Sequence, residues 1–560
     1  MKRLITVAVL GASTGLAAVT LAMQEGQSVV DTLHNLSATG PVEARAASEE
    51  QVCIFCHTPH NATPVQPLWN RELPPSAYTV YSSNALDARP GQPTGSSKMC
   101  LSCHDGTIAL GSVVSRDQRI QMTGGITTIP PGATNLVTDL SDDHPISFRF
   151  DSFLASRDPH LVDPSMLPPE LKLDPNRELQ CTTCHDAHDN SFGHFLVMSN
   201  QNNAALCRAC HQISTTTIAA HQDCNVCHRA HTAPSGPYLL TGDRITTTCL
   251  ECHDGAHPRA KDIADDLMKF STHDTNSRVD PDGAPWEHAT CVDCHDPHTM
   301  HQGTASAPNI PPNFGDVPGV SISGAPLESA NFAYEVCFRC HAENNAMETP
   351  YVPRVIVQTN TRLEFTPNAV SFHPVASPGK ASEVPSLKPP YTETSMIACS
   401  DCHASDAGMA GRRLGSAGVH GSSYPPLLAK RYETADYTPE SASAYALCYH
   451  CHYREGGTGV LNDVSFPHRA HVVDSRVPCS ACHDAHGVSS LQGNSRNNAH
   501  LINFDRTIVQ PDPATGRLEF AEEGRFSGSC FLSCHGVVHS GTAYLNGEPV
   551  EADMLRMLGR

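Results

Sequence analysis

Cysteine and histidine recur in this sequence in one arrangement. All 24 cysteines fall into twelve pairs, and a histidine directly follows the second cysteine every time. Only 33 of 560 residues are histidine, so chance does not explain this adjacency. Two thiols separated by two residues lie on one helical turn and face the same way. The spacing predicts two thioether bonds to one haem c, with the next imidazole as the proximal iron ligand.

The predicted attachment residues are distributed along the chain. The thioether cysteines are Cys53 and Cys56, Cys100 and Cys103, Cys181 and Cys184, Cys207 and Cys210, Cys224 and Cys227, Cys249 and Cys252, Cys291 and Cys294, Cys337 and Cys340, Cys399 and Cys402, Cys448 and Cys451, Cys479 and Cys482, and Cys530 and Cys534. The proximal ligands are His57, His104, His185, His211, His228, His253, His295, His341, His403, His452, His483 and His535. The last motif, CFLSCH, departs from the others by one extra residue between its cysteines. About twelve covalently attached haems c are expected.

Three other uses of paired cysteines fit this pattern less well. Zinc sites use Cys-X-X-Cys but close a tetrahedron with a second pair of ligands, and they need no adjacent histidine. A thioredoxin-like motif occurs once, in a βαβ context. Disulfide bonds are common in exported proteins, but they also impose no adjacent histidine. The repeated histidine therefore favours haem.

Five motifs carry an additional histidine three residues after the proximal one, as in CTTCHDAH. In that motif His188 lies on the same local turn as His185, so it cannot reach the opposite face of the same haem. If His188 binds iron, it binds another haem, which brings two porphyrins close together. The alternative is a hydrogen bond to a haem propionate. We expect ligation, since the same offset recurs five times.

Histidine is abundant enough for two imidazoles on every iron. The predicted distal ligands are His34, His60, His144, His188, His221, His231, His273, His298, His373, His420, His468 and His486. His288 competes with His273, and His471 competes with His468. The fifth haem unit lacks the additional histidine, and His420 is expected to replace it. Two histidines per iron imply low reduction potentials, whereas a methionine ligand would raise them.

The motifs group into six haem units of two motifs each. The predicted boundaries are 23–140, 141–215, 216–260, 261–350, 351–460 and 461–560, after a signal peptide at 1–22. In most units the first motif has the additional histidine, and another histidine lies upstream of it. This regularity predicts an array of haems.

The paired motifs resemble the doubled-CXXCH multihaem c-type cytochromes, including dodecahaem cytochromes of the kind found in metal-reducing bacteria. The stretches EEQVCIFCHTPHNATPVQPLWNR and CSDCHASDAG…HGSSYPPLL carry this resemblance, which extends over essentially the whole chain after the signal peptide. It implies little regular structure around closely stacked haems. It also implies electron transfer in the periplasm or at the cell surface, in anaerobic respiration and the reduction of extracellular metals. The implied partners are other redox proteins, such as periplasmic or outer-membrane cytochromes, and metal-oxide acceptors.

The expected fold is a multihaem cytochrome c, mostly irregular coil wrapped around a stacked haem array. Short α-helices are expected at the attachment sites, together with a few short β-hairpins. The stretches RVIVQTNTRLEF and RTIVQPDPATGRLEF are the hairpin candidates. The Pro- and Gly-rich stretch SAPNIPPNFGDVPGVSISGAP predicts a linker or a wrapping loop.

Composition narrows the class of protein. The net charge of −21 and the absence of a basic run argue against nucleic acid as the main partner. The start Met1-Lys2-Arg3 and the apolar stretch up to Ala22 predict an export signal, with an uncleaved membrane anchor as the alternative. No later stretch is apolar and long enough to span a bilayer. The mature chain is expected in the periplasm, at the outer-membrane surface or outside the cell.

Three functions remain open at this point. The first is electron transfer along about twelve low-potential haems, each with two histidine ligands. The second is a multihaem oxidoreductase with one open iron position, and the third is a subunit of a conductive cytochrome filament. Repeat regularity and surplus histidine favour electron transfer without catalysis.

Overall fold

The computed structural model describes residues 28–63, 68–234, 237–273, 275, 289–343, 350–381, 383–407, 417–524, 527–545 and 548–550. The predicted signal peptide lies outside these residues. The chain divides into two compact lobes. The N lobe comprises Met1–Gln212, Ala230–Thr232 and Gly236–Leu239, and the C lobe comprises Ile213–Arg229, Ala233–Ser235 and Leu240–Arg560. The first four motifs lie in the N lobe, and the other eight lie in the C lobe.

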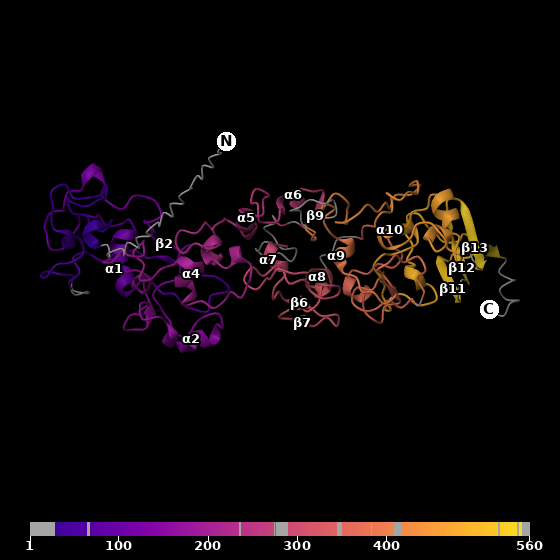
Figure 1. Cartoon of the computed structure of the whole chain (residues 1–560), viewed down its shortest axis with the longest axis horizontal. Helices are drawn as coiled ribbons and strands as arrows, with labels where there is room; N and C mark the ends of the chain where they lie inside the picture. Colours follow the sequence, from indigo (N-terminus) through magenta and orange to yellow (C-terminus); the bar gives the residue numbers. More distant parts are fainter. Residues whose placement is uncertain are drawn as a thin grey trace, which may run out of the picture. The chain divides into compact units, whose positions relative to one another are not determined.

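Irregular backbone dominates both lobes, and the helices within it are short (Figure 1). The α-helices are α1 Gly95–His104, α2 Ser152–Arg157, α3 Cys181–Cys184, α4 Gln201–Arg208, α5 Ile245–Leu250, α6 Ala264–Leu267, α7 Cys291–Cys294, α8 Ala333–His341, α9 Cys399–Cys402 and α10 Cys448–Cys451. Three more motifs begin on 3₁₀ turns, η2 Val52–Phe55, η6 Cys224–Val226 and η12 Cys479–Ala481. The expected helical turn at the attachment site is therefore present at eleven motifs.

The residue before the second cysteine helps to start several of these turns. In α7 the Asp293 carboxylate accepts hydrogen bonds from the backbone N–H of Thr290, at 2.7 Å, and from its hydroxyl, at 3.0 Å. Asp401 accepts a similar bond from the N–H of Ala398 at 2.8 Å in α9. Each bond satisfies a backbone donor that the first turn of a helix leaves unpaired. The motif sequence thus specifies its own local structure.

The sheets are small, and most join segments that are distant in the sequence. The two-stranded sheets pair β1 Thr79–Val80 with β2 Asp139–Leu140, β3 Phe148–Arg149 with β4 Glu178–Leu179, β5 Ser271–Thr272 with β9 Gly421–Ser422, β6 Gly319–Val320 with β7 Pro326–Leu327, and β8 Ser371–Phe372 with β10 Gly487–Val488. Only β1 and β2 run parallel among these pairs. A four-stranded antiparallel sheet contains β11 Glu519–Gly524, β12 Ser527–Cys534, β13 Val537–Leu545 and β14 Glu548–Val550 in that order.

The last motif contradicts the expected helix at every attachment site. Cys530 and Cys534 both lie on strand β12. The extra residue between them accounts for this difference. Residues that are four positions apart in a strand have side chains on the same face, so both cysteines can face the same side of β12. His535 is then in the two-residue turn between β12 and β13.

Neither predicted hairpin forms. In the first stretch Arg354 pairs with Asp505, and Thr361–Glu364 form the 3₁₀ turn η8. In the second, Gln510 pairs with Ser533, and β11 pairs with β12. Partners elsewhere in the chain replace the local turn in both cases.

The apolar core consists of small separate clusters with cysteines at their edges. One cluster contains Phe504, Leu532 and Tyr544, with Cys482 and Cys534 packed against it. Another contains Tyr334, Phe338 and Phe372, next to Cys399. The Pro- and Gly-rich stretch also contributes, because Val317 is buried there in a cluster next to Cys294. Among the described residues, no helix has the length and apolar character needed to cross a membrane.

Candidate functional site

All 24 cysteines lie in the described residues, and none of them forms a disulfide bond. Most are partly buried, and some of these, such as Cys210, Cys294 and Cys399, pack against the apolar clusters. Within the described part of the chain, no group of three or more His, Cys, Asp or Glu side chains is arranged to hold a metal ion. The histidines instead come together in twos.

Eleven pairs of histidine rings have their centroids 5.9–6.4 Å apart. In the N lobe these are His34–His104, His57–His188, His144–His211 and His185–His231. In the C lobe they are His221–His253, His228–His298, His273–His341, His295–His420, His403–His486, His468–His483 and His471–His539. A twelfth neighbour relation joins His452 and His373, because the charge of His373 lowers the pKa of His452.

This separation matches the space that an iron between two imidazoles requires. Metal–imidazole nitrogen bonds are about 2 Å long, and that nitrogen lies about 1.1 Å from the ring centre, so the two centres stand about 6.3 Å apart. Many of the rings also have Nδ1 occupied by a backbone carbonyl. His104 donates to Thr134 O at 2.7 Å, and His295 donates to Asn313 O at 2.7 Å. Such a bond orients the ring so that Nε2 is the nitrogen that meets the metal.

The pairs obey a rule that the sequence alone did not reveal. The additional histidine after a first motif lies beside the proximal histidine of the preceding haem unit. His188 pairs with His57, His231 with His185, and His298 with His228. His486 follows the same rule with His403. In the fifth haem unit His420 takes this place and pairs with His295.

The upstream histidines follow a second rule, within their own haem units. His34 pairs with His104, and His144 pairs with His211. His221 and His273 pair in the same way with His253 and His341, and His373 lies close to His452. In these five units the upstream histidine therefore lies beside the proximal histidine of the second motif. The sixth unit differs, because His468 lies beside His483, the proximal histidine of its first motif.

Two predicted site residues are not placed in such a pair. His60 is exposed, and no ring contact joins it to another histidine in the described residues. His535 lies beside Asp436 and Tyr437 instead of a histidine. His288, the competitor of His273, lies outside the described residues.

Burial keeps many of these imidazoles neutral at pH 7. It lowers the pKa of His144, His403, His420, His452 and His483 to about 4 in each case, with nearby histidines adding to the effect. A neutral imidazole retains the lone pair that a metal bond needs. These five histidines are therefore suited to bind iron without losing a proton first.

Carboxylates accompany several additional histidines. The Nδ1 of His231 lies 3.0 Å from Asp143 Oδ1, and the Nδ1 of His486 lies 3.3 Å from Glu364 Oε2. Burial alone would lower the pKa of each of these two histidines. The neighbouring carboxylate outweighs burial, so the pKa is raised. A carboxylate on Nδ1 also makes an imidazole a more basic metal ligand.

The thiols of successive motifs meet across the haem units. Hydrogen bonds join the side chains of Cys100 and Cys181, Cys249 and Cys291, Cys337 and Cys399, and Cys448 and Cys479. The bond to Cys181 raises the pKa of Cys100, and the pKa of Cys181 falls to about 7. Within one haem unit the two motifs are also neighbours. Desolvation raises the pKa of partly buried Cys56 and Cys184, and nearby Cys103 and Cys210 raise it further. Each lobe thus places consecutive attachment points side by side.

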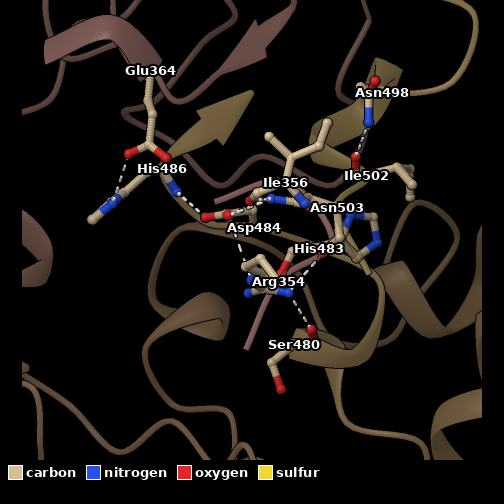
Figure 2. A network of polar contacts seen from close by, with 10 residues as sticks. All are labelled: Arg354, Ile356, Glu364, Ser480, His483, Asp484, His486, Asn498, Ile502 and Asn503. Carbon is tan, nitrogen blue, oxygen red and sulfur yellow. Dashed lines mark hydrogen bonds and ion pairs between the residues drawn. The ribbon is translucent and has the colours of Figure 1, made fainter. Parts of the chain in front are cut away.

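Buried arginines hold two of the motifs in place. Figure 2 shows Arg354, whose guanidinium donates to Ser480 O at 2.5 Å and to His483 O at 2.8 Å. Asp484 lies 3.4 Å from the same guanidinium and also accepts a 3.1 Å bond from Asn503. In the N lobe, fully buried Arg71 donates to the carbonyls of Ser102, Ala109 and Leu110.

Sequence reasoning missed these arginines and the carboxylate partners. The arginines occur singly and have no repeated spacing that would mark them. Some of the carboxylates could have been predicted from the sequence, because the motifs CHDAH and CHDPH repeat an aspartate between the two histidines. Asp186 and Asp296 in these motifs lie 3.1 and 3.4 Å from Nδ1 of His188 and His298.

A comparison with protein families reports a match to the doubled CXXCH motif at residues 174–214 and 217–258. The matched residues contain the four motifs that begin at Cys181, Cys207, Cys224 and Cys249. The other eight motifs lie outside the matched residues. Comparison with curated proteins gave no match.

Proposed function

We propose that this chain is a multihaem c-type cytochrome that transfers electrons along about twelve covalently attached haems. Its match to the doubled CXXCH motif at residues 174–214 and 217–258 supports this proposal. The observation that carries this proposal is the set of histidine pairs at 5.9–6.4 Å. Each haem would supply an iron that cycles between the ferric and ferrous states. The protein would hold that iron between two fixed imidazoles.

Closed coordination suits electron transfer better than catalysis. An iron with two histidine ligands has no position left for a substrate, whereas a multihaem reductase needs one open position. The rings are held by bonds such as His104 to Thr134 O and His253 to Lys261 O, at 2.7 and 2.8 Å. Fixed ligands need little rearrangement when the iron changes its charge.

The cysteine contacts support one array per lobe. A thioether joins the protein to the edge of a porphyrin, so adjacent cysteines bring the edges of two haems together. The hydrogen-bonded pairs Cys100–Cys181 and Cys337–Cys399 each join the second motif of one haem unit to the first motif of the next. The additional histidines also pair with histidines of the preceding haem unit, as His188 does with His57. Electrons would pass between successive haems along each lobe.

Two histidine ligands per iron favour low potentials. Carboxylates on Nδ1 of His231 and His486 would lower the potentials of their haems further, because they stabilise the ferric state. We propose an exported protein of the periplasm or the cell surface that exchanges electrons with other cytochromes or with metal oxides. The net charge of −21 favours partners with basic docking surfaces.

Carbon monoxide binding to the reduced holoprotein tests this proposal. Carbon monoxide enters an open position on ferrous haem, so the absorption spectrum of the reduced protein should stay unchanged. Haem content should be about twelve per chain. A spectral change that corresponds to one haem per chain would favour the oxidoreductase alternative.

A further inference from the structure

The twelfth motif lacks the geometry on which the eleven others depend. In those motifs a helical turn carries the thiols and the following imidazole together. Here Cys530 and Cys534 lie on β12, and the next two residues form the tight turn to β13. His535 has φ +48° and Gly536 has φ +76°, the left-handed values that a two-residue hairpin turn requires. The adjacent histidine is thereby placed at the end of the hairpin.

His535 is also engaged elsewhere. Its Nε2 lies 2.8 Å from Asp436 Oδ1, and its ring stacks on Tyr437 with centroids 4.3 Å apart. Paired histidines such as His104 and His231 use Nδ1, not Nε2, for contacts of this kind. In His535 the nitrogen that would bind iron already donates to a carboxylate.

Another histidine lies where this motif needs one. His539 is directly opposite Leu532 in the register of β12 and β13. Opposite residues share one face of a sheet, and that face of β12 also carries Cys530 and Cys534. The imidazole of His539 therefore stands between the two cysteines.

His539 has a partner at the same spacing as the other pairs. The centroids of His471 and His539 are 6.1 Å apart, with 30° between the ring planes. Nδ1 of His471 donates to Pro467 O at 3.0 Å, and Nδ1 of His539 shares a 3.3 Å hydrogen bond with the Tyr544 hydroxyl. Both rings thus keep Nε2 for the space between them.

The surroundings suit a flat apolar group. Cys530, Leu532 and Tyr544 are buried in one cluster, against which Phe466, Cys482 and Cys534 pack. Phe466 stacks on His471 and meets His468 edge-on, both with centroids 4.9 Å apart. His468 itself pairs with His483 of the eleventh motif. The two upstream histidines of the sixth haem unit therefore lie beside two different histidines, His468 beside His483 and His471 beside His539.

We propose that the twelfth haem, at Cys530 and Cys534, has its iron held by His471 and His539, and that His535 is not a ligand. The inference rests on the proposed function, because it requires a haem at this motif. At this one site, the histidine that directly follows the second cysteine is therefore not the iron ligand, and a histidine on the neighbouring strand takes its place. The two histidines come from the turn η11 Ala470–Asp474 and from β13.

The test compares His539→Ala with the matched control His535→Ala, both prepared as holoprotein with haem counted by intact mass. Electron paramagnetic resonance of the oxidised proteins reports spin state. In His539→Ala about one haem in twelve should change from low spin to high spin. His535→Ala should keep twelve haems, all low spin. A high-spin iron or a missing haem in His535→Ala, or no change in His539→Ala, would overturn the proposal.

A second variant covers a failure of His539→Ala to fold. Methionine can replace histidine as an iron ligand and raises the potential. His539→Met should therefore shift the potential of one haem upward, and an unshifted titration would contradict the proposal. The haem count and spin states of the unmodified protein distinguish a failure of this inference from a failure of the proposed function. Eleven low-spin haems with none at Cys530 and Cys534 would overturn only the inference, whereas open haems elsewhere would contradict electron transfer.

Discussion

The rings of His57 and His188 lie nearly parallel, with centroids 6.1 Å apart and 13° between their planes, although they belong to different haem units. His188 is three residues from its own proximal histidine, His185, which pairs with His231 instead. This crossed arrangement links successive haem units through their ligands. We expect His188→Ala to convert one haem, that of the first motif, to high spin without loss of haem.

His60→Ala is the matched control for this substitution. His60 occupies the same offset after its motif, but it is exposed and lies beside no other histidine in the described residues. Its removal should leave every iron low spin in the same magnetic resonance measurement. Equal effects of the two substitutions would show that the pairing rule is wrong.

The carboxylate behind His231 should set the potential of one haem. Asp143→Asn removes the negative charge 3.0 Å from Nδ1 and weakens the ferric state relative to the ferrous state. A tenfold change in relative affinity corresponds to about 59 mV, so an upward shift of several tens of millivolts is expected for one haem. Spectroscopic redox titration measures it. Asp163→Asn, on an exposed turn, should leave the titration unchanged, and a shift of similar size there would argue against a local effect.

Arg71 is expected to be a structural requirement of the N lobe. Its fully buried guanidinium satisfies the carbonyls of Ser102, Ala109 and Leu110. Arg71→Met leaves these groups unpaired and should lower the free energy of unfolding by about 3–5 kcal/mol. Arg157→Met removes an exposed ion pair with Asp87 and should cost less than about 1 kcal/mol. Soret circular dichroism during guanidinium unfolding compares them, and equal losses would contradict the prediction.

Acid should weaken the contact between Glu440 and Arg454. The Arg454 guanidinium, at 2.9 and 2.5 Å, lowers the pKa of the Glu440 carboxyl. A lowered folded-state pKa contributes stability above the unfolded value of about 4.5, and that contribution disappears as pH falls through the folded value. Glu440→Gln should therefore reduce stability by about 1–2 kcal/mol at pH 7, after allowance for screening at partly exposed Arg454. The melting temperatures of the two proteins should converge as pH falls through the lowered folded-state pKa of Glu440, and a constant difference at all pH values would exclude this cause.

Sequence spacing predicted the local structure at most of the motifs. Helical turns occur at eleven motifs because residues such as Asp293 and Asp401 stabilise them locally. The spacing also predicted that His188 could not serve the same iron as His185. These inferences need only the geometry of a few consecutive residues.

Long-range pairing required the structure. Nothing local distinguishes His60 from His188, because both follow a proximal histidine at the same offset, and only the structure places His188 beside His57. The hairpin at residues 506–520 was wrong because Gln510 pairs with Ser533 and not with a residue across the local turn. His539 was missed because it follows no motif spacing, and only the register of β12 and β13 places it opposite Leu532.

Low-temperature electron paramagnetic resonance of the fully oxidised, purified holoprotein, with haem counted per chain, tests the central claim most directly. The account predicts twelve haems whose signals are all low spin, because two imidazoles close every iron. A high-spin signal equivalent to one haem per chain would contradict it. That result would identify an open iron and would favour substrate reduction over electron transfer alone.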